Sequence, residues 1–209
     1  MRRLLGAVPA AALVKTFVFP HKLTLAWDLD GTLITHKTDV LPAASAEHTW
    51  ASVSTAGRVY SFWRRPYAEA VLKVLAVAND QHLFTAASRL YADSIVDALY
   101  PNTFKTRLYR EALVSTSCGK DLTRLGTPLD RTLLIDDQVR NRIGDQNFLF
   151  VNKYERREGM PESDRALVTV AVIVLAFNCI GASAFDVIRW LDLKVPSPQL
   201  LPPKAEAAK

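Results

Sequence analysis

The strongest constraint on the fold is a set of three short apolar runs, each ending at a polar residue that can take part in chemistry. They are Leu23–Trp27 before Asp28, His82–Phe84 before Thr85, and Thr132–Ile135 before Asp136. Further strands are predicted at 58–63, 104–109 and 148–151, and helices at 66–78 and 90–99. Strands that alternate with helices in this way predict an α/β fold, a Rossmann-like parallel sheet with helices on both faces. Because ligands of such sheets bind at the carboxyl ends of the strands, the three polar residues are expected to meet.

The spacing between these residues limits what can cover the site. Residues 32–57 show no regular pattern, and the strand at 58–63 is expected to form a small β flap. Asp28 and Thr85 are separated by 56 residues, and Thr85 and Lys120 by 34. Neither gap holds a separate domain of ordinary size, so no large cap domain is expected. A site open to solvent suits a protein segment better than a small metabolite, which needs enclosure.

Composition suggests one domain with two extensions. Residues 22–193 are expected to form the domain, with an N-terminal extension at 1–21 and a Pro/Ala-rich flexible tail at 194–209. Residues 1–27 contain four basic residues and no acidic one, which resembles a mitochondrial targeting segment. A secretory signal and an ordinary extension are the alternative interpretations. A mitochondrial location is therefore favoured, with the nucleus or cytoplasm as the alternative.

Charge and cysteine content bear on partners and compartment. The formal net charge is +5, and the basic residues are spread along the chain. This favours anionic substrates, and no arginine-rich arm or C-x-x-C pair indicates specific nucleic-acid binding. Cys118 and Cys179 are far apart in the chain, so a disulfide is not expected. We therefore expect a reducing compartment.

Residues 166–185 form a long apolar run that has two interpretations. About twenty apolar residues can span a bilayer, so membrane contact through this run is one of them. The run follows Pro161, Ser163 and Asp164, a pattern typical of the start of a helix. We favour a buried helix that covers the sheet, because the domain otherwise lacks its last covering helix.

The segment after the first strand carries the clearest chemistry. In Asp28-Leu29-Asp30-Gly31-Thr32, residues two apart on an extended chain point the same way, so Asp28 and Asp30 can face one pocket. Two close carboxylates favour a cation, and oxygen ligands suit Mg²⁺. Asp136 and Asp137 can supply further ligands. A carboxylate beside Mg²⁺ can attack phosphorus, while Thr85 and Lys120 can hold the phosphate.

These segments resemble a known superfamily. Residues 28–33 are similar to the first motif of the haloacid dehalogenase superfamily, and Thr85, Lys120 and Asp136-Asp137 are similar to the second, third and fourth. The closer likeness is to one branch, the phosphatases that act on the C-terminal domain of RNA polymerase II. It is carried by Arg65-Pro66-Tyr67, Leu83–Ala86, Tyr91-Ala92-Asp93, Arg107–Glu111 and Lys120–Gly126. The branch also includes the fifty-kilodalton receptor subunit of the mitochondrial inner-membrane import translocase.

The resemblance implies a Mg²⁺-dependent phosphatase that forms an aspartyl-phosphate and acts on phosphoserine or phosphothreonine in a protein. Asp28 would be the nucleophile and Asp30 the general acid/base. Thr85 and Lys120 would contact phosphate, and Arg110 would line the substrate groove. The metal would be held by Asp28, the Asp30 backbone carbonyl, and Asp136 or Asp137.

One departure and one alternative accompany this resemblance. The family commonly has Asp-Asn-Ser-Pro where this chain has Asp136-Asp137-Gln138-Val139, a change that keeps a metal ligand. The alternative is a non-catalytic scaffold or import-type subunit of a larger mitochondrial complex. The intact pair Asp28 and Asp30 favours the enzyme, because the import receptor usually lacks the full pair.

Overall fold

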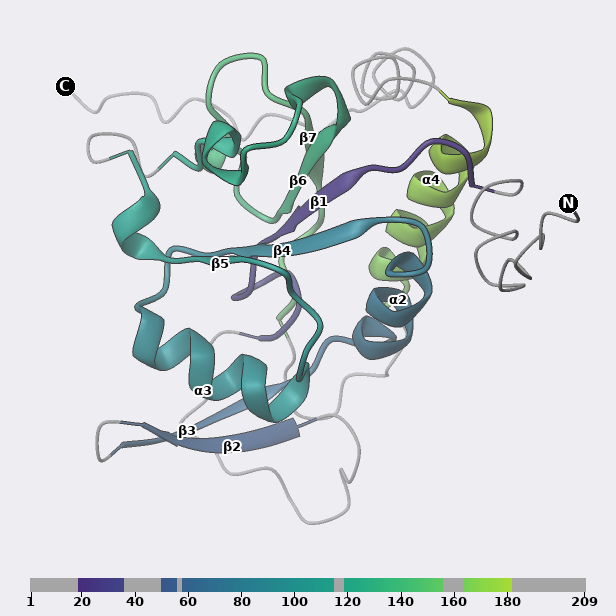
Figure 1. Ribbon diagram of the computed structural model, residues 1–209. Coiled ribbons are helices and arrows are strands. Elements are labelled where there is room, and N and C mark those ends of the chain that lie inside the picture. Colours follow the sequence, from purple (N-terminus) through teal and green to yellow (C-terminus); the bar gives the residue numbers. More distant parts are fainter. Residues whose placement is uncertain (1–18, 36–49, 56–57, 115–118, 156–163, 182–209) are drawn as a thin grey trace, which may run out of the picture.

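The computed structural model describes residues 19–35, 50–55, 58–114, 119–155 and 164–181 (Figure 1). Most of the predicted N-terminal extension and all of the predicted tail lie outside these residues. So do Cys118 and the Pro161 and Ser163 positions of the predicted helix start. The domain boundaries and the targeting segment therefore remain predictions.

Five parallel strands form the central sheet in the order β5-β4-β1-β6-β7. Their bounds are β1 Thr24–Trp27, β4 Asp80–Phe84, β5 Arg107–Leu108, β6 Thr132–Asp136 and β7 Phe148–Phe150. β1 lies in the middle, with Trp27 paired to Leu83 on one side and to Ile135 on the other. The sheet is buried on both faces, which explains why its strands appear in the sequence as short continuous apolar runs.

Different kinds of helix cover the two faces. Leu25, Trp27 and Leu83 point into the larger core, which α2 (Ala68–Leu75), α3 (Arg89–Leu99) and α4 (Ala166–Ile180) complete. Ala26, Phe84 and Leu134 point to the opposite face. The cover there consists of the 3-10 helices η1 (Arg110–Ala112), η2 (Leu122–Leu125) and η3 (Leu129–Arg131). The predicted Rossmann-like α/β layering is confirmed, with short 3-10 turns instead of α-helices on the second face of the described structure.

The flap is a hairpin and not a single strand. β2 (Trp50–Thr55) pairs antiparallel with β3 (Arg58–Trp63) and packs against α3, below it in Figure 1. The prediction that 32–57 is irregular was therefore wrong for β2. Its small residues give no apolar alternation, and pairing with β3 stabilises the strand instead. Between Asp28 and Thr85 the helices and strands of the described residues are this hairpin, α2 and β4, and none of them forms a large cap domain.

The helices α2 and α4 are rich in apolar residues, and sequence periodicity alone does not show which of these residues are buried. In α2 the buried residues include Val71, Leu72 and Leu75, whereas Val74 is 49% exposed. Apolar residues occur on several sides of α2, so the sequence pattern did not show which side of the helix faces the core. α4 packs beside α2 and buries Leu167, Val170 and Val174 among others (Figure 1). None of the helices in the described part of the chain has the length and apolar character needed to cross a membrane.

Asn178 explains the polar interruption in the apolar run of α4. Its Nδ2 donates to the His21 carbonyl at 2.6 Å and to Asn79 Oδ1 at 2.8 Å. Asn79 Nδ2 donates in return to Asn178 Oδ1 at 2.9 Å, and Asn79 Oδ1 accepts from the Leu23 backbone at 3.0 Å. This buried network joins the start of β1, the end of α2 and the end of α4, as expected of a core helix.

Candidate active site

The turn after β1 places Asp28 and Asp30 at the carboxyl edge of the sheet. Asp28 extends the strand by one residue, because its N–H donates to the Ile135 carbonyl at 3.0 Å. Leu29 is fully buried, and the chain then reverses at Gly31, whose φ is +89°. The Gly31 N–H donates to the Ile34 carbonyl at 2.7 Å, which closes the turn. Glycine is needed here because L residues with a side chain rarely adopt this conformation.

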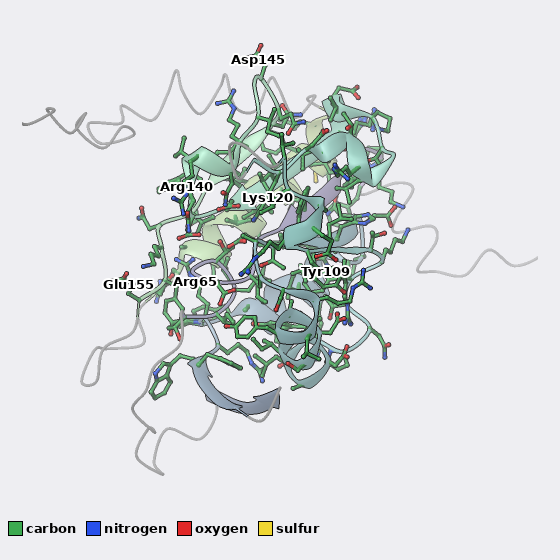
Figure 2. All side chains as sticks on the ribbon, turned by 90° about the vertical axis from the view of Figure 1, so that its left-hand side faces the viewer. Arg65, Tyr109, Lys120, Arg140, Asp145 and Glu155 are labelled. Carbon is green, nitrogen blue, oxygen red and sulfur yellow. The ribbon has the colours of Figure 1, made fainter. Side chains whose placement is uncertain are left out.

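Lys120 lies between carboxylates from two strands. Its Nζ donates to Asp28 Oδ1 at 2.5 Å and to Asp136 Oδ2 at 2.6 Å. The side chains of Lys120 and Asp136 are fully buried, and Asp28 is only 5% exposed. Figure 2 shows Lys120 inside the protein, with Arg140, Asp145 and Glu155 at the edge. A buried ammonium is stable only when it is paired and hydrogen-bonded in this way.

The turn after β6 holds Asp136 in one orientation. The Gln138 N–H donates to Asp136 Oδ1 at 2.7 Å. Asn141, at the end of η4 (Val139–Asn141), donates from Nδ2 to both carboxylate oxygens of Asp136, at 3.1 and 2.8 Å. The Asn141 carbonyl also accepts from the Lys120 N–H at 2.8 Å. Asn141 therefore positions both members of the Lys120–Asp136 pair, a role that no sequence pattern indicates.

Asp28, Asp136 and Asp137 form a buried acid cluster, with one carboxylate oxygen from each lying within 4.8 Å of the others. Among the described residues, neither carboxylate oxygen of Asp137 has a hydrogen-bond partner. The carboxylate faces Gly31 so closely that a Cβ there would lie 2.6 Å from Asp137 Oδ2. Burying a carboxylate without hydrogen-bond donors lowers the stability of the fold, so the three carboxylates form a candidate cation-binding site.

The electrostatics of the cluster favour a divalent cation. If all three carboxylates are ionised, they and the Lys120 ammonium carry a formal charge of −2, which a divalent ion would cancel. Burial raises the pKa of Asp28 to about 8, with Lys120 opposing the rise and Asp136 adding to it. Burial, together with the charge of Asp136, raises the pKa of Asp137 to about 6. Burial lowers the pKa of Lys120, but Asp28 and Asp136 outweigh it and the net direction is upward. The donor set consists of oxygens, which suits a hard cation such as Mg²⁺.

Asp30 is partly buried and is held from another element. Tyr91, in the first turn of α3, donates from its hydroxyl to Asp30 Oδ1 at 2.8 Å. Tyr91 lies in one of the family-like segments, but no role for it could be predicted from the sequence. The contact joins residues 61 positions apart, which only the folded chain can show.

Thr85 and Arg110 lie on the β4 side of the site. Thr85 comes directly after β4, which pairs with β1, and its Oγ1 accepts from the Ala87 N–H at 3.1 Å. The exposed Arg110 donates from Nε to the Ala86 carbonyl at 2.9 Å. Arg110 therefore lies against the loop that carries Thr85. The structure brings Asp28, Lys120, Asp136 and Asp137 into one cluster, and it shows no direct contact of Thr85 or Arg110 with these four.

Arg65 is a further residue whose role the sequence did not reveal. Its guanidinium is 1% exposed and donates to the carbonyls of Gly31 at 3.4 Å and Thr32 at 3.2 Å. It also donates to the Asn152 carbonyl at 2.8 Å and pairs with Asp164 at 2.9 Å. Asp164 in turn accepts from the Ala166 N–H at 2.8 Å at the start of α4, although the N-cap residue of this helix is Arg165. Arg65 thus links the turn after β1 to β7 and α4.

The expectation of a site open to solvent needs correction. Asp136 and Lys120 are fully buried, and Asp137 is 7% exposed. These side chains are therefore buried at the strand ends, even though the described residues include no large cap. The spacing of the motifs did not indicate this burial.

The fold and the acid cluster define an α/β protein with a buried carboxylate–lysine site at the carboxyl ends of its parallel strands. The sequence profile of the NLI interacting factor-like phosphatases matches residues 23–178. The chain belongs to this family, which confirms the resemblance to the phosphatases of the RNA polymerase II branch. The family implies use of a divalent metal, and the oxygen-rich cluster fits one.

Individual relatives agree with this assignment. The chain is 32% identical to phosphatase Herzog of Drosophila melanogaster over 126 residues, which cover 59% of this chain and 36% of that protein. It is 33% identical over 125 residues to carboxy-terminal domain RNA polymerase II polypeptide A small phosphatase 2 of Homo sapiens, covering 58% and 46%. The chain thus spans less than half the length of these relatives.

Solved structures show the same fold. Fcp1, an essential RNA polymerase II CTD phosphatase, matches with a TM-score of 0.54 and 20% identity, over 92% of this chain and 58% of that one. A fission yeast Fcp1 variant bound to beryllium fluoride matches with a TM-score of 0.55 at the same identity, over 92% and 60%. At this identity the likeness establishes the architecture, and the site rests on the geometry above.

Proposed function

We propose that the protein is a Mg²⁺-dependent phosphatase that forms an aspartyl-phosphate on Asp28 and acts on phosphoserine or phosphothreonine in a protein. The observation that carries the proposal is the buried cluster of Asp28, Asp136 and Asp137 around Lys120. It combines three acidic side chains, one of which (Asp137) has no hydrogen-bond donor among the described residues, with the ammonium of Lys120. A purely structural lysine would need only one of these carboxylates.

The proposed reaction has two steps. An Asp28 carboxylate oxygen attacks phosphorus as the bond to the leaving oxygen breaks, and Asp30 gives that oxygen a proton. Water then attacks the phosphorus of the aspartyl-phosphate, gives a proton to Asp30 and releases Asp28. Asp28, the Asp30 carbonyl, and Asp136 or Asp137 would hold Mg²⁺. The bound ion would neutralise negative charge on the phosphate oxygens.

Other residues bind and orient the phosphate in this scheme. Lys120 offers a buried positive charge next to Asp28, and Thr85 offers a hydroxyl from the neighbouring strand. Arg110 is exposed beside the Thr85 loop, where it can contact the substrate chain outside the buried cluster. Relatives named as phosphatases of the RNA polymerase II carboxy-terminal domain support a protein substrate for this chain.

The scaffold alternative and the cellular location depend on residues outside the described structure. Membership of a mitochondrial complex stays a prediction from the N-terminal composition, as does a mitochondrial location. Retention of Asp28, Asp30 and Lys120 in one site favours the enzyme, since a scaffold needs none of this chemistry.

The test is hydrolysis of para-nitrophenyl phosphate with Mg²⁺ or with EDTA. Wild type should be active only with Mg²⁺, and Asp28→Asn should abolish activity. Asp145→Asn is the control, because Asp145 is an exposed carboxylate far from the cluster in Figure 2. Equal silence of wild type and Asp28→Asn would refute the enzyme and favour the scaffold. Unchanged activity of Asp28→Asn would refute the nucleophile.

A further inference from the structure

We propose that the Tyr91 hydroxyl is a positioning group for catalysis, which orients Asp30 so that one chosen oxygen exchanges the proton. This inference rests on the proposed phosphatase function. Its structural basis is the 2.8 Å hydrogen bond from Tyr91 Oη to Asp30 Oδ1. Nothing in the family-like motifs assigns this role to the residue.

The elements around Tyr91 make it a firm support. Its ring is partly buried and packs against the larger hydrophobic core, so the fold holds the ring independently of the hydroxyl. Tyr91 lies in α3, whose first turn closes through the bond from the Ala92 N–H to the Ser88 carbonyl at 2.9 Å. Asp30, by contrast, lies in a turn and is only partly buried. The hydrogen bond therefore restricts the motion of the Asp30 carboxylate, which lies in a turn, by linking it to a residue of a helix.

The bond also distinguishes the two oxygens of Asp30. An oxygen that already accepts the tyrosine hydrogen is the poorer place for a second proton, so Oδ2 is assigned the transferable one. In the first step the proton moves from Oδ2 to the leaving oxygen as the P–O bond breaks. In the second step water, as it bonds to phosphorus, returns a proton to Oδ2. Tyr91 keeps its own proton throughout.

Tyr91 is also close in the chain to Thr85, the proposed phosphate contact. Thr85 Oγ1 accepts from the Ala87 N–H, and α3 begins two residues later at Arg89. One short segment therefore carries both the proposed phosphate contact and the support of the acid.

Loss of a positioned acid has a characteristic kinetic effect. A weakly basic leaving group departs without a proton, whereas a strongly basic one needs the acid. Para-nitrophenyl phosphate and phenyl phosphate have nearly the same size, but phenolate is the much stronger base. The parameter kcat/KM reports the first chemical step and is compared between the two substrates.

The experiment measures kcat/KM of wild type and Tyr91→Phe on both substrates with Mg²⁺. Tyr91→Phe should lower the value for phenyl phosphate by about tenfold, a part of the ~10²–10⁴-fold that a positioned acid supplies. The value for para-nitrophenyl phosphate should fall less than about threefold. Asp30→Asn should show the same selectivity in a stronger form, since it removes the acid itself.

Tyr109→Phe is the matched control. Its hydroxyl also donates to a carboxylate at 2.6 Å, but the acceptor is Asp93 Oδ1, which belongs neither to the acid cluster nor to the proposed catalytic pair. It should leave the ratio of the two kcat/KM values unchanged. An equal fall on both substrates in Tyr91→Phe, or a change confined to KM, would overturn the positioning role. Wild-type silence on both substrates would instead refute the proposed function itself.

Discussion

Replacement of Arg65 by methionine tests how the turn after β1 is held. Methionine fills much of the same volume but removes the charge and all the donors. The three carbonyls of Gly31, Thr32 and Asn152 lose a donor, and the Asp164 carboxylate, 25% exposed, loses its partner. Loss of one partner of a buried ion pair costs about 3–5 kcal/mol. For a chain of this size that is a fall in Tm of roughly 10 °C.

The activity should fall further than the stability explains. Arg65 binds the two carbonyls that follow Asp30, so its loss lets Asp28 and Asp30 move relative to Lys120. Misplacement of reacting groups by about 1 Å can cost ~10²-fold in rate. We therefore expect kcat/KM on para-nitrophenyl phosphate to drop at least about tenfold at a temperature where the variant is folded.

The neighbouring Arg64 provides the control for this experiment. Its guanidinium pairs with Glu69 at 2.6 Å near the surface, where the two side chains are 26% and 47% exposed. Such a pair contributes about 0–1 kcal/mol, so Arg64→Met should shift Tm by only a few degrees. Circular dichroism gives Tm for both variants. Equal effects of Arg64→Met and Arg65→Met on Tm and kcat/KM would show that Arg65 does not hold the turn after β1.

Three further predictions address the glycine turn, the Asn178 network and the acid cluster. Gly31→Ala should abolish hydrolysis, because the new Cβ would lie 2.6 Å from Asp137 Oδ2. Gly126→Ala is the control, since Gly126 also has a positive φ, +66°, but has open space around it. It should lower the free energy of unfolding by only about 1–2 kcal/mol and keep activity. Loss of activity in both variants would show that backbone strain, not the contact with Asp137, is responsible. Asn178→Ala should lower the free energy of unfolding by about 2 kcal/mol, since it removes buried hydrogen bonds to His21 and Asn79. Val172→Ala, at a 63% exposed position of the same helix, should leave urea unfolding nearly unchanged, and equal losses would contradict the network. In EDTA, Asp137→Asn should stabilise the protein more at pH 7 than at pH 4. The raised pKa of Asp137, about 6 when folded, means that its ionisation costs the folded state stability as pH rises from about 4 through 6. A Tm difference that shrinks with pH would contradict this sign.

The sequence predicted the strand ends well because burial on both faces leaves a plain signal. Leu23–Trp27 and Thr132–Ile135 are short apolar runs, and parallel strands must bring Asp28 and Asp136 to the same edge. The order of the motifs then identified Lys120, whose ammonium reaches both acids. The strand ends follow from local pattern and topology, whereas Lys120 was identified through its likeness to the third motif of the superfamily.

The supporting residues could not be predicted because they act across long separations. Tyr91 binds Asp30 and Arg65 binds Asp164, contacts that depend on how α3 and α4 pack. Asn141 orients Asp136 from a 3-10 turn, which has no periodic signal. Burial of the cluster was also missed, because motif spacing shows which domains are absent but not how closely loops cover the strand ends.

A crystal structure of the protein with Mg²⁺ and beryllium trifluoride, a mimic of the phosphoryl group, would show whether Asp28 is the nucleophile and whether the three carboxylates hold the metal. We expect the beryllium adduct on Asp28, with the ion bound by Asp28 and by Asp136 or Asp137, and Lys120 beside the mimic. An adduct on another residue, or an ion that binds away from the three carboxylates, would contradict this expectation.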